Sequence, residues 1–246
     1  MKKQYLRISK NVLFKIISAL YCKKFYPWST IIVVLVISAC PRPAPKYNLR
    51  NDTRANDIEG YIKSELSSDR NGWQKPDEVI EALFIKEGDI VADVGAGAGY
   101  FTPRLSAAVG NKGTVYATET LDELVELLLK TTTEHGLANV KVVKATPENP
   151  RLPYASLDLA FVCNNMPRVD LVFVFFDQIK RSLKTGGRLA LIDWREDSRF
   201  GGPPEFRRSK KEVIKILTGM GFVLIKDYDF LPEQYFLVFS LKERFG

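Results

Sequence analysis

A glycine-rich turn between an apolar stretch and a helical pattern constrains this sequence more than any other feature. Residues 89–94 (DIVADV) have the composition of a buried strand, and three glycines follow within residues 95–99. A helical pattern then spans residues 100–109. Glycine adopts positive φ angles and lets a ligand approach the main chain. A strand, a glycine turn and a helix in this order predict the nucleotide-binding unit of an open α/β sheet.

Two carboxylates near this turn bear on the choice of ligand. Asp93 lies two residues before Gly95, where it would repel a pyrophosphate but attract an ammonium or sulfonium group. Glu119 ends the stretch 114–119, and there we expect it to accept hydrogen bonds from both hydroxyls of a ribose. The ribose contact would serve several adenosine ligands. Three interpretations therefore remain open here: a cofactor with a cationic group, a dinucleotide such as NAD, and a turn that only packs a helix on a strand.

Helical and strand patterns alternate along the chain from about residue 58. Such alternation predicts an α/β fold, a doubly wound, Rossmann-like sheet with helices on both faces. The expected strands are 89–94, 113–118, 140–144, 157–163, 188–194, 222–230 and 234–241, and the expected helices are 76–84, 100–109, 121–135, 171–183 (ended by Gly186 and Gly187) and 210–220.

The glycine turn also belongs to a longer resemblance. VADVGAGAGY (91–100), LKTGGRLALIDWRED (183–197) and FLPEQYFLVF (230–239) resemble segments of class I S-adenosylmethionine (SAM)-dependent methyltransferases. The resemblance covers roughly residues 70–240. It implies seven strands, mostly parallel, with one antiparallel C-terminal strand beside the fifth. It also implies SAM as the cofactor.

The same resemblance implies a set of cofactor-binding residues. In relatives the glycine turn wraps the methionine part of SAM, and the residue at the end of the second strand holds the ribose. Relatives often carry an acid near the adenine after the third strand, and here either Thr146 takes its place or Glu148 reaches in. Asn164 replaces an acid after the fourth strand, where that segment faces the transferred methyl. The expected set is Asp93, Gly95, Ala96, Gly97, Gly99, Tyr100, Glu119, Thr146 and Asn164.

The catalytic residues are not determined by these patterns. Asn164 can hold an acceptor, but an amide cannot take its proton at neutral pH. Pro167 stands at the position where relatives carry a histidine. Asp193 ends the fifth strand on the side where ligands bind in such sheets. Asn164 and Asp193 are therefore the two candidates for a catalytic role, and no metal site is expected.

The N-terminal residues differ in composition from the rest. Residues 1–39 hold seven of the 36 basic residues and no acid, so the remaining 29 basic residues balance the 29 acidic ones. The net charge of +7 therefore belongs to this leader, and no nucleic-acid partner is expected. The apolar run 31–39 is shorter than a membrane-spanning helix requires and is typical of a signal peptide.

The end of this leader, Ile37-Ser38-Ala39-Cys40, resembles the lipobox of bacterial lipoproteins. We expect lipidation at Cys40, a flexible tether over 40–57 and a methyltransferase domain over 58–246. These features predict a membrane-associated protein, a bacterial lipoprotein, and leave the side of the membrane open.

Two functions follow as expectations. The first is a SAM-dependent methyltransferase that acts on a small-molecule or envelope acceptor. The alternative is an exported or membrane-tethered binding protein that keeps the fold without the chemistry. The alternative is favoured by Asn164 and Pro167, and by a leader that would separate the domain from cytoplasmic SAM.

Overall fold

A computed structural model describes residues 57–166, 172–201 and 207–241, all within one compact unit that spans Pro45–Gly246. Cys40, Pro167, the leader and most of the tether lie outside the described residues. The elements are α4 (Ile58–Glu65), α5 (Arg70–Gln74), α6 (Pro76–Ala82), β1 (Ile90–Val94), α7 (Thr102–Val109), β2 (Thr114–Glu119), α8 (Asp122–Glu134), β3 (Val140–Lys144), β4 (Leu157–Cys163), α9 (Val172–Ser182), β5 (Leu183–Trp194), α10 (Lys210–Gly219), β6 (Phe222–Tyr228) and β7 (Gln234–Leu241).

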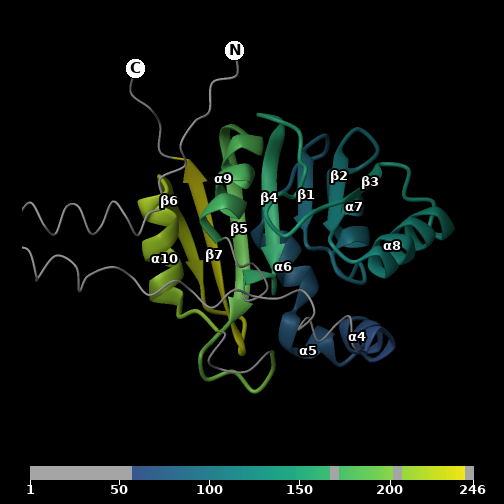
Figure 1. Ribbon diagram of the computed structural model, residues 1–246, viewed down its shortest axis with the longest axis horizontal. Helices are drawn as coiled ribbons and strands as arrows, with labels where there is room; N and C mark the ends of the chain where they lie inside the picture. Colours follow the sequence, from purple (N-terminus) through teal and green to yellow (C-terminus); the bar gives the residue numbers. More distant parts are fainter. Residues whose placement is uncertain (1–56, 167–171, 202–206, 242–246) are drawn as a thin grey trace, which may run out of the picture. The chain divides into compact units, whose positions relative to one another are not determined.

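Seven strands form one sheet in the order β3-β2-β1-β4-β5-β7-β6 (Figure 1). The pairs from β3 to β5 are parallel, whereas β7 is antiparallel to both β5 and β6. The expected Rossmann-like sheet with one antiparallel C-terminal strand is therefore confirmed. Its strand order reverses between β1 and β4, and open α/β sheets bind ligands at the carboxyl ends of strands beside such a reversal.

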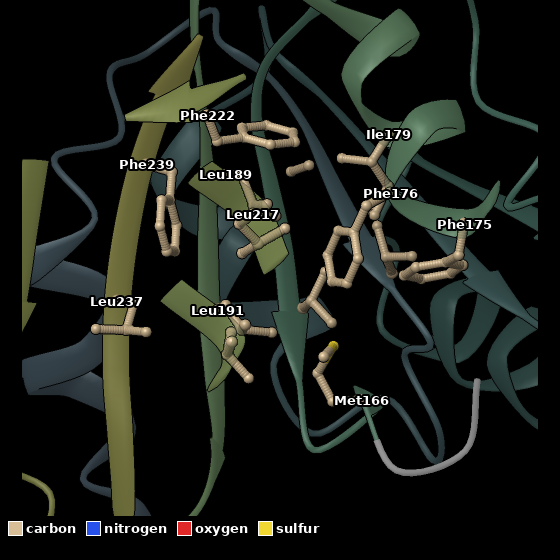
Figure 2. Close-up of a cluster of buried hydrophobic side chains, with 14 of the residues drawn as sticks. Met166, Phe175, Phe176, Ile179, Leu189, Leu191, Leu217, Phe222, Leu237 and Phe239 are labelled. Carbon is tan, nitrogen blue, oxygen red and sulfur yellow. The ribbon is translucent and has the colours of Figure 1, made fainter. Parts of the chain in front are cut away.

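Helices cover both faces of the sheet. Helices α9 and α10 pack on one face through a cluster that includes Phe176 and Leu217, and Figure 2 shows these side chains beside Leu191 and Leu237 of the strands. Residues of α6 and α7 form a second cluster with strand residues of the other face. The central strands are buried on both faces, and for this reason their sequences are continuous runs of apolar residues.

The amino ends of β1 and β4 are joined through Asp158. Its Oδ2 accepts a hydrogen bond from the backbone N–H of Ile90 at 2.8 Å, and Lys184 Nζ lies 2.7 Å from the same oxygen. These contacts lie at the end of the sheet opposite the glycine turn, so Asp158 has a structural role.

The junction between α9 and β5 departs from the sequence prediction. The helix ends at Ser182, and residues 183–187 already belong to β5 instead of forming a helix-ending turn. Leu183 pairs with Leu157, and the register then shifts so that Leu159 pairs with Arg188. The extra residues form an irregularity in the strand, which a glycine at position 186 permits with its φ of 78°.

Helices α4 and α5 are additions that the sequence patterns did not reveal. In Figure 1 they lie below the sheet, at the end where the parallel strands finish. Asp57 caps α4 by accepting a hydrogen bond from Gly60 N–H at 2.9 Å. Across the described ranges, no helix is both long and apolar enough to span a membrane.

Candidate cofactor site

The glycine turn is hydrogen-bonded to the end of β2. The N–H groups of Gly95 and Ala96 both donate to the carbonyl oxygen of Thr118, at 3.0 and 2.9 Å. The N–H of Gly97 donates to Glu119 Oε2 at 3.0 Å. The carboxylate predicted to hold a ribose is thus held against the turn itself.

Glycine is required at two positions of this turn because both have positive φ and close neighbours. Gly95 has a φ of 75°, and an ideal Cβ there would lie 2.6 Å from the Cγ of Asn165. Gly97 has a φ of 58°, and a Cβ there would lie 2.8 Å from the hydroxyl oxygen of Tyr61. A side chain at either position would combine backbone strain with a clash.

Asp93 is the penultimate residue of β1, a central strand of the sheet, and only 3% of its surface is exposed. Thr102 Oγ1 donates to its Oδ2 at 2.7 Å. Burial raises the pKa of Asp93 to about 6, and the carboxylates of Glu119 and Glu65 add to this, whereas the Thr102 hydrogen bond and Arg70 oppose it. A cationic ligand group would offset the cost of ionising this buried carboxyl.

The second carboxylate oxygen of Glu119, Oε1, lies against the start of the loop that follows β2. Oε1 accepts hydrogen bonds from the N–H of Thr120 at 2.6 Å and of Leu121 at 3.2 Å. The side chain is almost fully buried, with 1% exposed. Four hydrogen bonds to the two oxygens hold the carboxylate in one orientation, which is the preorganisation that a ribose-binding acid requires.

An ion pair from the N-terminal helices covers this turn. Arg70 Nη1 donates to Glu65 Oε2 at 2.8 Å, and the guanidinium carbon lies 3.9 Å from the centre of the Tyr100 ring. Burial lowers the pKa of Arg70, but the adjacent Glu65 carboxylate, together with Cys163 and Tyr100, keeps that pKa above its ordinary value. Arg70 therefore stays charged although only 4% of its surface is exposed.

A chain of buried amides links these helices to the end of β4. Gln74 Oε1 accepts from Arg70 Nε at 3.3 Å, and Gln74 Nε2 donates to Gln234 Oε1 at 2.6 Å. Gln234 in turn donates to the side-chain oxygen of Asn164. Asn164 thus takes part in a polar network under the N-terminal helices, and its neighbour Asn165 is the residue that contacts the glycine turn.

The other expected residues lie at varying distances from the turn. Tyr100 is buried, and its hydroxyl donates to Asn71 Oδ1 at 2.6 Å. Thr146 forms a small turn with Asn149 just beyond β3. Asp193 lies at the end of β5, where its Oδ1 accepts from the N–H of Trp194 at 2.8 Å and 2% of the residue is exposed.

The structure therefore brings together Asp93, the glycines, Tyr100 and Glu119. Of these residues, Gly95 and Glu119 line a small cavity together with Ala145 and Asn165. Its volume of about 20 Å³ is little more than one water needs. Within the described ranges, no group of three or more His, Cys, Asp or Glu side chains has a metal-binding arrangement.

Several residues at this site were not predicted from the sequence. They are Tyr61, Glu65 and Arg70 of the N-terminal helices, and Asn165 after β4. Only the Asp57 cap before an apolar pattern signalled α4. No local signal could have placed these residues near the turn, since the separations along the chain are 25 residues or more.

Comparisons with known proteins bear on the fold, the family and the cofactor. The family described as a methyltransferase domain matches residues 91–187, from β1 into β5. A solved SAM-dependent methyltransferase from Aquifex aeolicus is 31% identical with a TM-score of 0.70, and the match covers 73% of this chain and 96% of that one. The protein-L-isoaspartate O-methyltransferase of Methanococcus aeolicus is 30% identical over 111 residues, which are 45% of this chain and 49% of that relative.

A longer but weaker match is the ubiquinone/menaquinone biosynthesis C-methyltransferase of Shewanella sp. (strain ANA-3), which is 24% identical over 78% of this chain and 71% of that relative. The fold, the glycine turn with its two buried carboxylates, and the extent of the Aquifex match together define a class I methyltransferase. The chain belongs to the family of SAM-dependent methyltransferases. SAM is the cofactor that this site fits, because the buried acids suit its cationic and ribose groups.

Proposed function

We propose that this protein transfers the methyl group of SAM to a small-molecule or envelope acceptor by in-line displacement. The observation that carries the proposal is the pairing of two buried carboxylates, Asp93 and Glu119, with a turn in which both Gly95 and Gly97 must be glycine. When bound, the cofactor supplies an electrophilic methyl group on a sulfonium. The protein then has to position the acceptor and exclude water.

The relatives bear on the acceptor in only a general way. The matched relatives are named for O-methylation of isoaspartate in proteins and for C-methylation in quinone biosynthesis. These acceptors differ chemically, and our proposal therefore stops at the acceptor class. Asp193 and Asn164 remain our candidates for acceptor contact. Asn164 directly follows β4, which lies beside the strand-order reversal, and Asp193 is the penultimate residue of the neighbouring strand β5.

The experiment is methyl transfer from methyl-labelled SAM by the full chain, with extracted small molecules and extracted envelope material as separate acceptor pools. Incorporation of label by the wild type but not by an Asp93→Asn variant would support the proposal. Tight SAM binding by calorimetry without incorporation into either pool would contradict it.

A non-catalytic binding protein is the second candidate, and the state of Asn164 favours it. Its side-chain oxygen accepts from Gln234 within a buried network, and only an amide stands where relatives carry an acid. SAM binding without transfer is the outcome that this candidate predicts.

We also propose that Cys40 is lipidated and tethers the protein to a membrane. The support is the sequence Ile37-Ser38-Ala39-Cys40 after an apolar run with basic residues before it. Mass spectrometry of the protein from its native membrane would detect a diacylglyceryl group on an N-terminal Cys40. An intact leader in that sample would contradict the proposal.

A further inference from the structure

A buried tyrosine hydroxyl lies at the end of the sheet that also carries the cofactor turn. Tyr235 is the second residue of β7, and only 4% of its surface is exposed. Its hydroxyl oxygen has no hydrogen-bond partner among the residues that the structure describes. A buried hydroxyl without a partner destabilises a fold, and such groups are rare in folded proteins. The Tyr235 hydroxyl is therefore a candidate for contact with a ligand.

The register of the sheet places Tyr235 next to Asp193. Tyr235 of β7 pairs with Asp193 of β5, and residues paired in this way point to the same face of a sheet. Asn164, which directly follows β4, donates its backbone N–H to the carbonyl oxygen of Ile192. Neighbouring strands lie about 4.8 Å apart, so Asp193 is about one strand spacing from the end of β4 and Tyr235 about two. This row lies at the carboxyl ends of β4 and β5, where an open α/β sheet binds its ligands.

The buried cluster that contains Tyr235 also reaches the segment beside the cofactor turn. Met166 belongs to the same cluster, and Figure 2 shows it at one end of that cluster. The residue before it, Asn165, has the side chain that meets Gly95. A molecule bound at Tyr235 and Asp193 would thus be near the place where the cofactor presents its methyl group.

The charges around Tyr235 select the chemical group that fits it. Burial raises the pKa of Tyr235, and the Asp193 carboxylate adds to this, so the hydroxyl keeps its proton and is a hydrogen-bond donor. Glu212 and Glu196 act in the same direction, whereas Arg208 opposes them, and this excess of negative charge disfavours an anionic ligand. An ammonium group cannot accept from Tyr235. A hydroxyl group can accept from Tyr235 and donate to Asp193 at the same time.

We propose that Tyr235 and Asp193 bind a hydroxyl group of the methyl acceptor, which is therefore a hydroxylated compound. The Tyr235 hydroxyl donates to the oxygen of that group, and the Asp193 carboxylate accepts from it. Because the Tyr235 hydroxyl has no partner among the described residues, the acceptor displaces none of them from it. The inference rests on the proposed function and deepens it by naming the class of acceptor and a residue that binds it.

The test compares Tyr235→Phe with the wild type, both as the full chain. Thermal unfolding should give the same Tm or a higher one, because the variant loses a hydroxyl without a partner. Label incorporation from methyl-labelled SAM into the two extracted acceptor pools should fall about 5- to 100-fold at low extract concentration. The rate should recover as the extract is concentrated, because the variant binds the acceptor more weakly. SAM affinity by calorimetry should change less than about twofold.

Tyr228 provides a matched control, because its hydroxyl has a partner inside the protein. It donates to the carbonyl oxygen of Ala82 at 3.1 Å. Tyr228→Phe should therefore lower the Tm by about 2–8 °C and leave label incorporation within about twofold of the wild type. A Tm loss in Tyr235→Phe as large as that in Tyr228→Phe would overturn the proposal, since it would show a structural hydrogen bond. Unchanged label incorporation by Tyr235→Phe would overturn it as well.

The class of acceptor is tested on the wild type. Mass spectrometry of the labelled product should show a hydroxyl group or a newly formed methoxyl group, and a product with neither would overturn the proposal. If the wild type incorporates no label, the proposed function fails and retention of extracted compounds tests the inference. The wild type should then retain hydroxylated compounds at least about fivefold better than Tyr235→Phe, and equal retention would overturn the inference as well.

Discussion

Replacement of Asp93 by asparagine should stabilise the protein without ligand while it weakens the cofactor site. Burial raises the pKa of Asp93 from an ordinary 3.8 to about 6. The folded state therefore binds this proton more tightly than the unfolded chain. Stability from this group is complete below pH 3.8 and is lost as the pH rises through 6, which amounts to about 3 kcal/mol.

Asparagine removes the ionisation but keeps an oxygen that can accept a hydrogen bond from Thr102 Oγ1, which lies 2.7 Å from Asp93 Oδ2 in the wild type. Asp93→Asn should therefore raise the free energy of unfolding at pH 7.5 by about 1–3 kcal/mol, or roughly 2–12 °C in Tm. Near pH 4 the two proteins should differ little. Urea unfolding of both proteins across pH 4–8, monitored by tryptophan fluorescence, measures this difference directly.

A matched control is Asp158→Asn, because Asp158 accepts from Lys184 and from the Ile90 backbone N–H. That substitution should destabilise the protein at pH 7.5. A difference between wild type and Asp93→Asn that stays constant from pH 4 to 8 would refute the reasoning, and so would a less stable Asp93→Asn at pH 7.5. Weaker SAM binding by the more stable variant would show that stability has been exchanged for function at this residue.

Three further predictions follow from the site and the core. Glu119→Ala leaves buried N–H groups without their acceptor, so it should lower the free energy of unfolding by about 2–4 kcal/mol, measured by urea unfolding. It should also abolish SAM binding, measured by calorimetry. Unchanged stability would contradict the hydrogen-bond pattern. Gly95→Ala should weaken SAM binding because its Cβ meets Asn165. Gly136→Ala is the control: its φ is 62° and open space surrounds it, so SAM binding should be unchanged. Equal effects of the two variants on SAM affinity would indicate that backbone strain, and not the contact with Asn165, controls binding. Phe176→Ala should cost about 3–5 kcal/mol in urea unfolding, because Phe176 is fully buried between α9 and the sheet, and a loss below about 1 kcal/mol would contradict that packing.

The sequence predicted the sheet well because its strands are apolar runs bounded by clear turn signals. The limits of β3, β4 and β7 are the same in the prediction and in the structure. The junction at residues 183–187 was wrong, because two glycines that resemble the end of a helix instead permit an irregular strand. Helices α4 and α5 were missed because each is short and its stability comes from distant contacts, such as Gln74 with Gln234.

The sequence alone determined the class of fold and the position of the cofactor turn. Hydrophobic periodicity is local, and so is the requirement for glycine in a turn between a strand and a helix. A carboxylate next to that turn can also be recognised from a few neighbouring residues in the sequence. These features identify Asp93, and the end of the second expected strand identifies Glu119.

Only the tertiary structure decided what surrounds the turn. Tyr61 and Glu65 lie on Gly97, although more than 30 residues separate them along the chain, and Asn164 joins the network through Gln234. The burial that raises the pKa of Asp93 is likewise a property of the assembled sheet. Contacts of this kind arise when packing brings distant segments together, and no local pattern of residues records them.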